Sequence, residues 1–428
     1  MRSSGWISKV LDEVVDIFGG GTPKTSASEY WGGDIPWLSV KDFNDDTRVV
    51  YHTEKSITSL GLMNSAARVL DEGDVVISAR GTVGEVTQLG RPMAFNQSCY
   101  GLRGKRGQLD NTYLYYLLRH KVRDFNQRSH GSVFSTITRD TFRGIHVLLP
   151  EVDEQTAIAA TLSCLDDKIE LNNRMNKTLE EMAQALFKSW FVDFDPVKAK
   201  MEGREPAGMD AETAALFPDE FEESELGPIP KGWRTGRLGE VVASIRQAAS
   251  LAEIGDDCPY VGLEHIPRKS LMLESWGQAS EISSQKSSFR AGNILFGKLR
   301  PYFHKVSIAP VDGICSTDIL AFSASEEWYG FAVGHLYSTD LIDYATNLSQ
   351  GTRMPRVNLK DISNYPVVLP GLGIASAYSN VAASWFAHML ANARQNSRLS
   401  ALRDTLLPRL MSGEIRVPQA EEIMEEVL

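Results

Sequence analysis

Residues 158–190 read IAATLSCLDDKIELNNRMNKTLEEMAQALFKSW, and the spacing of their side chains predicts the architecture of the chain. Apolar residues recur every three or four positions along this stretch, and the pattern returns over 378–406. A period of about 3.5 residues is typical of helices that pack on one another as a coiled coil. The predicted seam residues are Leu162, Leu165, Ile169, Asn172, Asn176 and Leu179 in the first helix, and Trp385, His388, Asn392, Leu399, Leu402 and Leu406 in the second.

Each predicted seam is apolar at its ends and polar in its middle, which favours antiparallel pairing of the two helices. In the register that aligns these layers, Asn172 faces Asn392 and Asn176 faces His388. An unpaired buried amide costs about 1–3 kcal/mol, so pairing of the polar layers selects both direction and register. The sequence leaves one alternative open, in which each helix packs separately on its own globular domain.

The chain also contains an internal repeat. EGDVVISARG (72–81) is matched by AGNILFGKLRP (291–301), and IHVLLP (145–150) is matched by YPVVLP (365–370). The second pair is offset by 220 residues, 365 minus 145, and each member precedes one of the two long helical stretches. The repeating unit is therefore a globular domain followed by a helix. Short β-like runs mixed with helical stretches predict an α+β fold for each domain.

The expected architecture is an α+β fold with two globular domains in a pseudo-two-fold arrangement, separated by a long antiparallel coiled coil of two helices. The predicted segments are a first domain at 1–150, a central helical spacer at 151–197, an acidic linker at 198–231, a second domain at 232–370, a distal helical spacer at 371–412 and an acidic C-terminal tail at 413–428. We expect the linker, which is rich in acidic residues, Pro and Gly, to be a flexible connection or a surface strap outside the core.

Composition limits the classes of function. No apolar run reaches the roughly 18 residues that a membrane span requires, and the N-terminus lacks the apolar region of a signal peptide. The four cysteines are too scattered for a disulfide framework or a zinc site, so we expect a cytoplasmic protein without a metal. The formal net charge is −11, yet 91–143 holds ten Lys and Arg against three Asp. Such a segment could bind a polyanion, although a solvated basic face remains an alternative.

The Gly-rich stretch GGGTPKTSASEYWGGDIPW (19–37) invites comparison with a nucleotide-binding loop. Such a loop needs Gly-x-x-x-x-Gly-Lys-Ser/Thr, so that successive backbone N–H groups surround the phosphates. Placing Lys24 and Thr25 in this pattern puts Phe18 and Pro23 where glycines are required, and proline has no N–H to donate. The chain also lacks the [DNS]-P-P-[YF] loop of adenine methylases and a PD-…-[DE]-x-K nuclease pattern. We therefore expect no enzymatic activity in this chain.

Six segments together resemble the specificity (S) subunit of a Type I restriction-modification system. They are GGGTPKTSASEYWGGDIPWLSVKDF (19–43), SARGTVGEV (78–86), FNQSCYGLR (95–103), LPEVDEQTAIAATLSCLDDKIELNNRMN (149–176), LFKSWFVDFDPVKAK (186–200) and SELGPIPKGW (224–233). The resemblance covers essentially the whole chain. The second domain departs from the pattern, because 245–266 lacks the GGTP and YWGGDIPW elements.

The resemblance implies a non-catalytic subunit with two target recognition domains, which read the two parts of a split double-stranded DNA site while the helices set the gap. It implies two methyltransferase (M) subunits and restriction (R) subunits as partners, with S-adenosylmethionine, ATP and Mg²⁺ bound by those partners rather than by this chain. We expect the M subunits to dock on the helices and on 186–200, whose aromatic residues could equally be core. The alternative function is a coiled-coil scaffold that joins two protein-binding domains without DNA.

Candidate DNA contacts are cations, amides and hydroxyls in the expected loops, because arginine suits guanine or phosphate and amides suit adenine. In the first domain they are Lys24, Thr25, Ser26, Lys41, Arg80, Thr82, Asn96, Gln97, Arg128, Ser132, Phe134, Ser135 and Arg139. In the second domain they are Lys298, Arg300, Tyr302, His304, Lys305, Arg353 and Arg356. Ion pairing within the fold is an alternative for the arginines, as is turn capping for Asn96 and Gln97. We expect Trp31 and Trp37 to pack beneath the Gly-rich loop.

Overall fold

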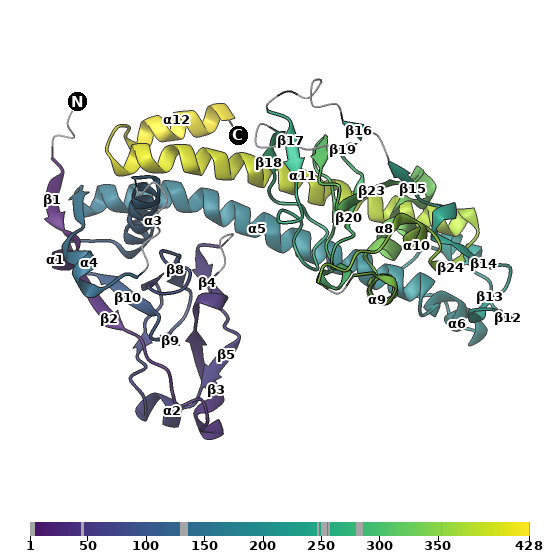
Figure 1. Cartoon of the computed structure of the whole chain (residues 1–428), viewed down its shortest axis with the longest axis horizontal. Helices are drawn as coiled ribbons and strands as arrows, with labels where there is room; N and C mark the ends of the chain where they lie inside the picture. The colour runs from purple at the N-terminus through teal and green to yellow at the C-terminus, as the bar shows by residue number, and fades with distance from the viewer. Residues whose placement is uncertain are drawn as a thin grey trace. The chain divides into compact units, whose positions relative to one another are not determined.

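The structure is a computed structural model that describes residues 5–43, 47–128, 136–245, 248–249, 255, 257–279, 286–351 and 353–427. The chain divides into two compact units (Figure 1): unit 1 comprises Met1–Glu170 and Arg398–Leu428, and unit 2 comprises Leu171–Ser397. Two long helices, α5 (Val152–Phe191) and α11 (Leu372–Met411), each contribute one part to unit 1 and one part to unit 2. The expected α+β class is confirmed. Among the described residues, no helix is both long enough and apolar enough to cross a membrane.

The described part of unit 1 contains a globular domain built on two small sheets, with strand orders β2-β10-β7-β8-β4 and β5-β3-β9-β6. The strands are β2 (Val15–Gly19), β3 (Trp31–Leu38), β4 (Val49–Val50), β5 (Lys55–Ile57), β6 (Val69–Leu70), β7 (Val75–Ser78), β8 (Val86–Leu89), β9 (Met93–Phe95) and β10 (Cys99–Gly104). The other elements are β1 (Ile7–Val10), α1 (Leu11–Val14), η1 (Ser28–Tyr30), η2 (Val40–Asp42), α2 (Ser59–Met63), α3 (Asn111–Arg128), α4 (Arg139–Arg143) and β11 (His146–Leu149). All four residues of β7 are buried, because α3 packs against β7 and β8.

The described part of unit 2 repeats this plan, with strand orders β15-β23-β20-β21 and β16-β19-β22-β17-β18. The strands are β15 (Ala243–Ile245), β16 (Ala248–Ala249), β17 (Pro259–Val261), β18 (Gly277–Gln278), β19 (Lys286–Phe289), β20 (Ile294–Gly297), β21 (Val306–Ile308), β22 (Gly313–Cys315) and β23 (Ile319–Ser323). The other elements are β14 (Arg234–Arg237), η3 (Leu238–Glu240), η5 (Pro301–Phe303), α8 (Glu326–Tyr337), α9 (Thr339–Leu348), α10 (Leu359–Ser363) and β24 (Pro366–Leu369). In each unit an antiparallel ladder joins the two ends of the domain: β1 pairs with β11, and β14 pairs with β24.

The segment 198–231 is not a linker, which corrects the prediction from composition. It contains α7 (Ala211–Leu216) and the hairpin of β12 (Phe221–Ser224) and β13 (Gly227–Pro230), after α6 (Asp195–Met201). Phe217 and Ile229 are buried in the core of unit 2. The outer face of the segment is charged, which makes its average composition acidic. The few apolar residues that pack it against the core of unit 2 do not show in that average.

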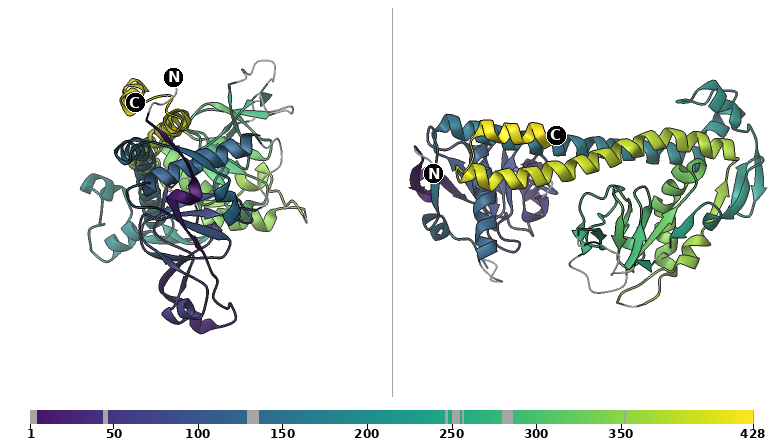
Figure 2. Two further views of the ribbon diagram at one scale, coloured as in Figure 1. Left: turned by 90° about the vertical axis from the view of Figure 1, so that its left-hand side faces the viewer. Right: turned by 90° about the horizontal axis from the view of Figure 1, so that it is seen from above.

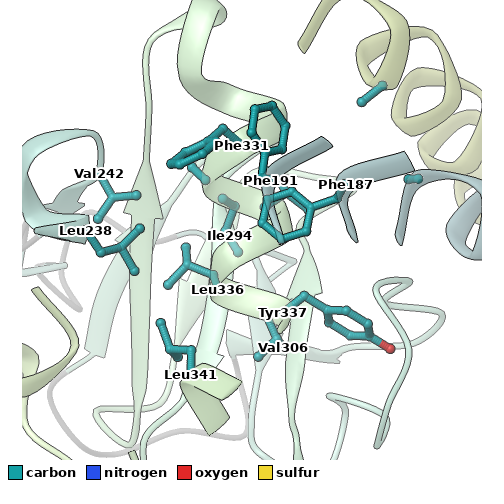
Figure 3. Close-up of a cluster of buried hydrophobic side chains, with 14 of the residues drawn as sticks. Phe187, Phe191, Leu238, Val242, Ile294, Val306, Phe331, Leu336, Tyr337 and Leu341 are labelled. Carbon is teal, nitrogen blue, oxygen red and sulfur yellow. The ribbon is translucent and has the colours of Figure 1, made fainter. Parts of the chain in front are cut away.

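The aromatic residues near the end of α5 also belong to the core of unit 2, as Figure 3 shows for Phe187 and Phe191. The Phe191 ring lies 5.0 Å from that of Phe331, and the Trp190 ring lies 5.1 Å from that of Phe217. Of the two interpretations that the sequence left open for these aromatic residues, the structure supports core packing rather than an exposed partner surface.

The expected C-terminal tail forms helix α12 (Val417–Val427), which lies beside the long helices in the views of Figure 2. Ala420 and Ile415 are buried in the core of unit 1, and Arg416 pairs with Glu154 of α5. The segment is therefore a packed helix with an acidic outer face rather than a tail.

In unit 1, α5 and α11 pack together through aliphatic side chains. The buried residues are Ile158, Leu162, Leu165 and Ile169 of α5, and Leu399, Leu402, Leu406 and Leu410 of α11. Asp166 accepts a hydrogen bond of 2.6 Å from Arg403 across the pair. Arg416, just past the end of α11, bonds to Glu154 near the start of α5, so the two helices run antiparallel within this unit, as predicted.

In unit 2, the helices pair through amides. Asn172 Nδ2 donates to Asn396 at 2.8 Å and to Gln395 at 2.9 Å, and Asn392 Nδ2 donates to Asn176 at 2.9 Å. The direction is antiparallel, but the predicted facing pairs are wrong by about one helical turn. Polarity alone could not separate the possible partners, because an amide and an imidazole are equally polar.

The buried face of α11 in unit 2 therefore differs from the predicted seam. His388 is exposed and bonds to the Ser384 carbonyl of its own helix, while Trp385 is only half-buried. The buried positions are instead Ala382, Phe386, Met389, Ala393 and Asn396. On α5, Asn172, Asn176 and the half-buried Leu179 lie on the predicted face.

Candidate nucleic-acid interface

The turn between β20 and β21 is the most unusual piece of backbone in the second domain. Arg300 and His304 flank η5, and both have a left-handed backbone with φ of 52°. Such a conformation costs a non-glycine residue roughly 1–3 kcal/mol, and it persists only where surrounding contacts impose it. Here the Arg300 N–H donates to Pro355 at 2.7 Å, and its guanidinium donates to the Arg353 carbonyl at 3.2 Å. The 353–356 loop and the 300–304 turn therefore form one surface.

Arg268 joins this surface, although the sequence did not indicate it. Its guanidinium carbon lies 3.8 Å from the centre of the Phe303 ring, and the exposed Tyr302 ring meets Phe303 edge-on at 4.8 Å. Arg268 is exposed. We call Arg268, Tyr302 and Phe303 the stacked cluster. The basic pair Arg268-Lys269 was the only sign of it in the sequence, because the contact with Phe303 is tertiary.

A hollow of about 640 Å³ lies in the same domain, lined by apolar side chains together with polar and cationic ones. Those that could bind an anion or a base edge are Lys286, Ser287, Lys298, Thr317, Gln350, Arg356 and Asn358. Asp318 accepts from Arg356 at 2.8 and 3.2 Å, and this bond lowers the pKa of the Asp318 carboxyl. Arg356 therefore already has an internal partner, whereas Arg353 is exposed nearby.

Two predicted contacts of the second domain point inward, which corrects their assignment. His304 is only 6% exposed, and its Nε2 lies 2.9 Å from the Tyr337 carbonyl. Burial lowers the pKa of His304. Lys305 Nζ donates to the Leu263 carbonyl. Tyr302 on the same turn is exposed, but neither of these two side chains is available to a ligand.

In the first domain, Lys24, Thr25 and Ser26 are exposed on the loop between β2 and η1. Two indoles support this loop from below: Trp37 donates to the Gly21 carbonyl at 3.0 Å, and Trp31 donates to the Lys24 carbonyl at 3.3 Å. Their rings meet edge-on at 5.1 Å. The prediction that the two tryptophans pack beneath the Gly-rich loop is confirmed.

The loop after β7 presents Arg80 and Thr82 to solvent. Gly81 and Gly84 have φ of 81° and 95°, and a Cβ on Gly84 would lie 2.7 Å from Val122 of α3. Glycine therefore lets the loop turn tightly against α3 while Arg80 projects outward.

The remaining predicted contacts of the first domain are in varied surroundings. Asn96 Oδ1 accepts from the Ser98 N–H at 3.1 Å, which supports turn capping, whereas Gln97 is exposed. Lys41 is exposed on η2, and Arg139 is exposed with one bond to the Ile17 carbonyl at 3.1 Å. The side chain of Arg128, together with Ser132, Phe134 and Ser135, lies outside the described residues.

A second hollow, of about 410 Å³, adjoins the Gly-rich loop. Thr25 and Trp31 line it together with Lys55, whose ammonium lies 5.8 Å from the Trp31 ring centre. Sequence reasoning missed Lys55 because strand pairing between β3 and β5 brings it there. The two domains thus each present exposed cations, hydroxyls and amides, the groups that bind phosphate oxygens and base edges.

Comparison with known proteins finds one family along the chain. The profile described as Type I restriction modification DNA specificity domain matches residues 3–181. The Type I restriction enzyme MjaIX specificity subunit of Methanocaldococcus jannaschii is 28% identical over 97% of this chain and 94% of its own length. The HindI specificity subunit of Haemophilus influenzae is 28% identical over 67% of this chain and 72% of its own length.

A solved structure supports the fold. The crystal structure of a Type I restriction-modification S subunit from M. genitalium aligns with a TM-score of 0.56 at 14% identity. The alignment covers 96% of this chain and 97% of that one, so the likeness extends over both units.

Proposed function

We propose that the chain is a specificity subunit of a Type I restriction-modification system and that it reads a bipartite target in double-stranded DNA. In this proposal each globular domain recognises one half-site, while α5 and α11 set the gap between the half-sites. Methyl transfer and cleavage take place on M and R subunits, which bind S-adenosylmethionine, ATP and Mg²⁺. The chain itself is non-catalytic and acts in the cytoplasm.

The observation that carries the proposal is a basic loop at the equivalent place in both domains. Arg80 follows β7, and Arg300 follows β20, the strand equivalent to β7 in the repeat. Each loop has a left-handed residue at or beside the arginine, Gly81 in the first and Arg300 itself in the second. Arg80 is exposed in the first loop, and Arg268 and Arg353 are exposed beside the second. Phosphate contacts from such cations set the register on a duplex, and base-edge contacts set the sequence.

We further propose that an exposed apolar stripe on α5 docks an M subunit. Leu171, Met175 and Met182 are each 42–46% exposed, and they lie four and seven residues apart along α5. An exposed stripe with roughly heptad spacing suits a helix from a partner. The aromatic residues of 186–200 are excluded from this role because the core buries them.

Docking can be tested by placing a charge on the stripe. Met175→Glu and Met182→Glu should each reduce the amount of M subunit that co-purifies with the chain, since a buried unpaired carboxylate opposes association. Lys177→Glu, on an exposed position between them, is the matched control. Equal recovery of the M subunit with all three variants would contradict the stripe as its docking surface.

DNA reading can be tested with the chain bound to its M subunit and duplexes that carry the site it methylates. Arg80→Ala and Arg268→Ala should each weaken binding by about tenfold or more, the typical value of a good arginine contact. Arg91, between β8 and β9, and Arg290, just before β20, are exposed outside the two loops, so their alanine variants are matched controls. Absence of salt-dependent duplex affinity in the wild-type complex would favour a protein scaffold instead.

A further inference from the structure

Glu180 is a buried carboxylate that the DNA contacts described above do not use. It lies on α5 within unit 2 and is only 8% exposed. Its Oε2 accepts from the Leu271 N–H at 2.8 Å, and its Oε1 accepts from the Tyr337 hydroxyl at 2.7 Å and from Gln184 at 3.0 Å. All three donors are neutral. Burial raises the pKa of the Glu180 carboxyl, although these hydrogen bonds oppose the rise.

The Tyr337 side of this network leads to the turn that carries part of the stacked cluster. The backbone carbonyl of Tyr337 bonds to His304 Nε2 at 2.9 Å, and the two rings lie 4.7 Å apart. His304 is the left-handed residue that ends η5, immediately after Tyr302 and Phe303. The bond from the Tyr337 hydroxyl to Glu180 therefore fixes Tyr337, and Tyr337 in turn holds the 300–304 turn through its contact with His304.

The Leu271 side leads to the other half of the stacked cluster. Leu271 is three residues beyond Arg268, and its carbonyl accepts from the Ile308 N–H at 2.8 Å. Lys269, next to Arg268, has a left-handed φ of 53°, and its N–H donates to the His304 carbonyl at 2.9 Å. Glu180 thus bonds to both segments whose side chains meet in the Arg268–Phe303 stack.

We propose that Glu180 is a positioning residue for DNA recognition, which holds the stacked cluster of the second domain in the orientation that binds the duplex. The inference rests on the proposed function. A carboxylate suits this role because its two oxygens accept from two directions at once. A methionine of similar size would pack well at the site but would fix neither segment. An apolar residue at this position would avoid the free-energy cost of burying a carboxylate. The presence of the acid is therefore consistent with a requirement for orientation.

The test compares base discrimination in the two half-sites, using the full chain bound to its M subunit. Glu180→Gln keeps the shape of the side chain but replaces one acceptor oxygen with an NH2 donor, so the side chain can no longer accept from both Leu271 and Tyr337. Tyr337→Phe removes the hydroxyl bond alone and is the milder second variant. Glu181→Gln changes the exposed neighbour and is the matched control. Binding is measured to duplexes with single base-pair substitutions in either half-site.

A wild-type complex should lose about tenfold or more in affinity for a substitution in either half-site. Glu180→Gln should reduce this penalty to about threefold or less in the half-site of the second domain, leave the other half-site unchanged, and show a normal thermal unfolding profile. Tyr337→Phe should also reduce the penalty in the half-site of the second domain, but by a smaller factor. The control should match the wild type.

Two results would overturn the inference: full discrimination by a folded Glu180→Gln variant, or an equal loss in both half-sites. If Glu180→Gln does not fold, full discrimination by Tyr337→Phe would have the same meaning. A wild-type complex that discriminates in neither half-site would instead contradict the proposed function.

Discussion

Helix α5 carries one buried carboxylate in each unit, and the two are satisfied in different ways. Asp166 in unit 1 accepts from the Arg403 guanidinium and from the Tyr116 hydroxyl, both at 2.6 Å. Glu180 in unit 2 accepts only from neutral groups among the contacts described. The ion pair offsets the desolvation of Asp166, whereas Glu180 depends on hydrogen bonds and on an aromatic core beside it. The two halves of the repeat therefore share a fold but not the contacts that attach each domain to the helix.

The packing of α5 against α11 also differs in polarity between the two units. Its core is aliphatic in unit 1, and it includes a layer of amides in unit 2. Asn172 is fully buried, and its Oδ1 has no hydrogen-bond partner within the described structure. An aliphatic layer supplies stability but tolerates shifts of register, whereas paired amides favour one register at some cost in stability.

The largest expected effect comes from removing the cation in unit 1. Arg403→Met leaves Asp166 buried without its charge partner, which should lower the free energy of unfolding of unit 1 by about 3–5 kcal/mol. Urea unfolding combined with hydrogen exchange on peptides of α3 would measure it. The double variant Arg403→Met/Asp166→Leu should recover most of the loss. A single variant no worse than the exposed control Arg398→Met would contradict this account of the pair.

The amide layer should give an intermediate effect. Asn172→Leu leaves the Asn396 Oδ1 without its donor, at a cost of about 1–3 kcal/mol in unit 2, while Asn396 Nδ2 still donates to Asn173. Asn172→Leu/Asn396→Leu should restore stability because both polar groups are removed together. Urea unfolding of the two variants beside the wild type tests this. A double variant less stable than the single one would show that the amides stabilise the fold rather than select its register.

The smallest expected effect is a dependence of unit 2 on acid. His335 is buried between Phe187 and Phe331, and burial lowers its pKa to about 3 from an ordinary 6.5. The unfolded chain therefore takes up a proton below pH 6.5 that the folded chain refuses, and stability falls as the pH drops from 6.5 towards 3. The loss at pH 5.5 should be about 1 kcal/mol. Unfolding followed across this range should show a weaker dependence for His335→Leu, and an unchanged dependence would contradict the assignment to His335.

The repeat, the two long helices and the α+β class were predictable because they depend on patterns that extend over many residues. The directions in which individual side chains point could not be predicted. His304 lies in a basic stretch, two residues after the exposed Tyr302, yet the left-handed turn directs it inward to Tyr337. Arg268 was missed for the opposite reason, since its partner Phe303 is distant in sequence. The facing residues of the helix pair could not be chosen by polarity, because several polar side chains fall at similar spacing.

Composition misled the prediction for 198–231 and for the C-terminal segment. Acidic residues, Pro and Gly dominate both averages, but attachment to a core needs only a few apolar side chains. Phe217 and Ile229 provide that attachment in the first segment, and Ile415 and Ala420 provide it in the second. Position-specific burial of this kind is set by tertiary packing, which an average over the segment does not record.

The central claim, that each domain reads one half-site independently, is tested most directly by a domain exchange. Residues 19–143 would be replaced by the equivalent segment of a relative with a different target, and methylated adenines would be mapped across the genome of cells that express the hybrid with the M subunit. We predict a bipartite motif in which one half changes, while the other half and the gap stay the same. An unchanged motif, or a change in both halves, would contradict the claim.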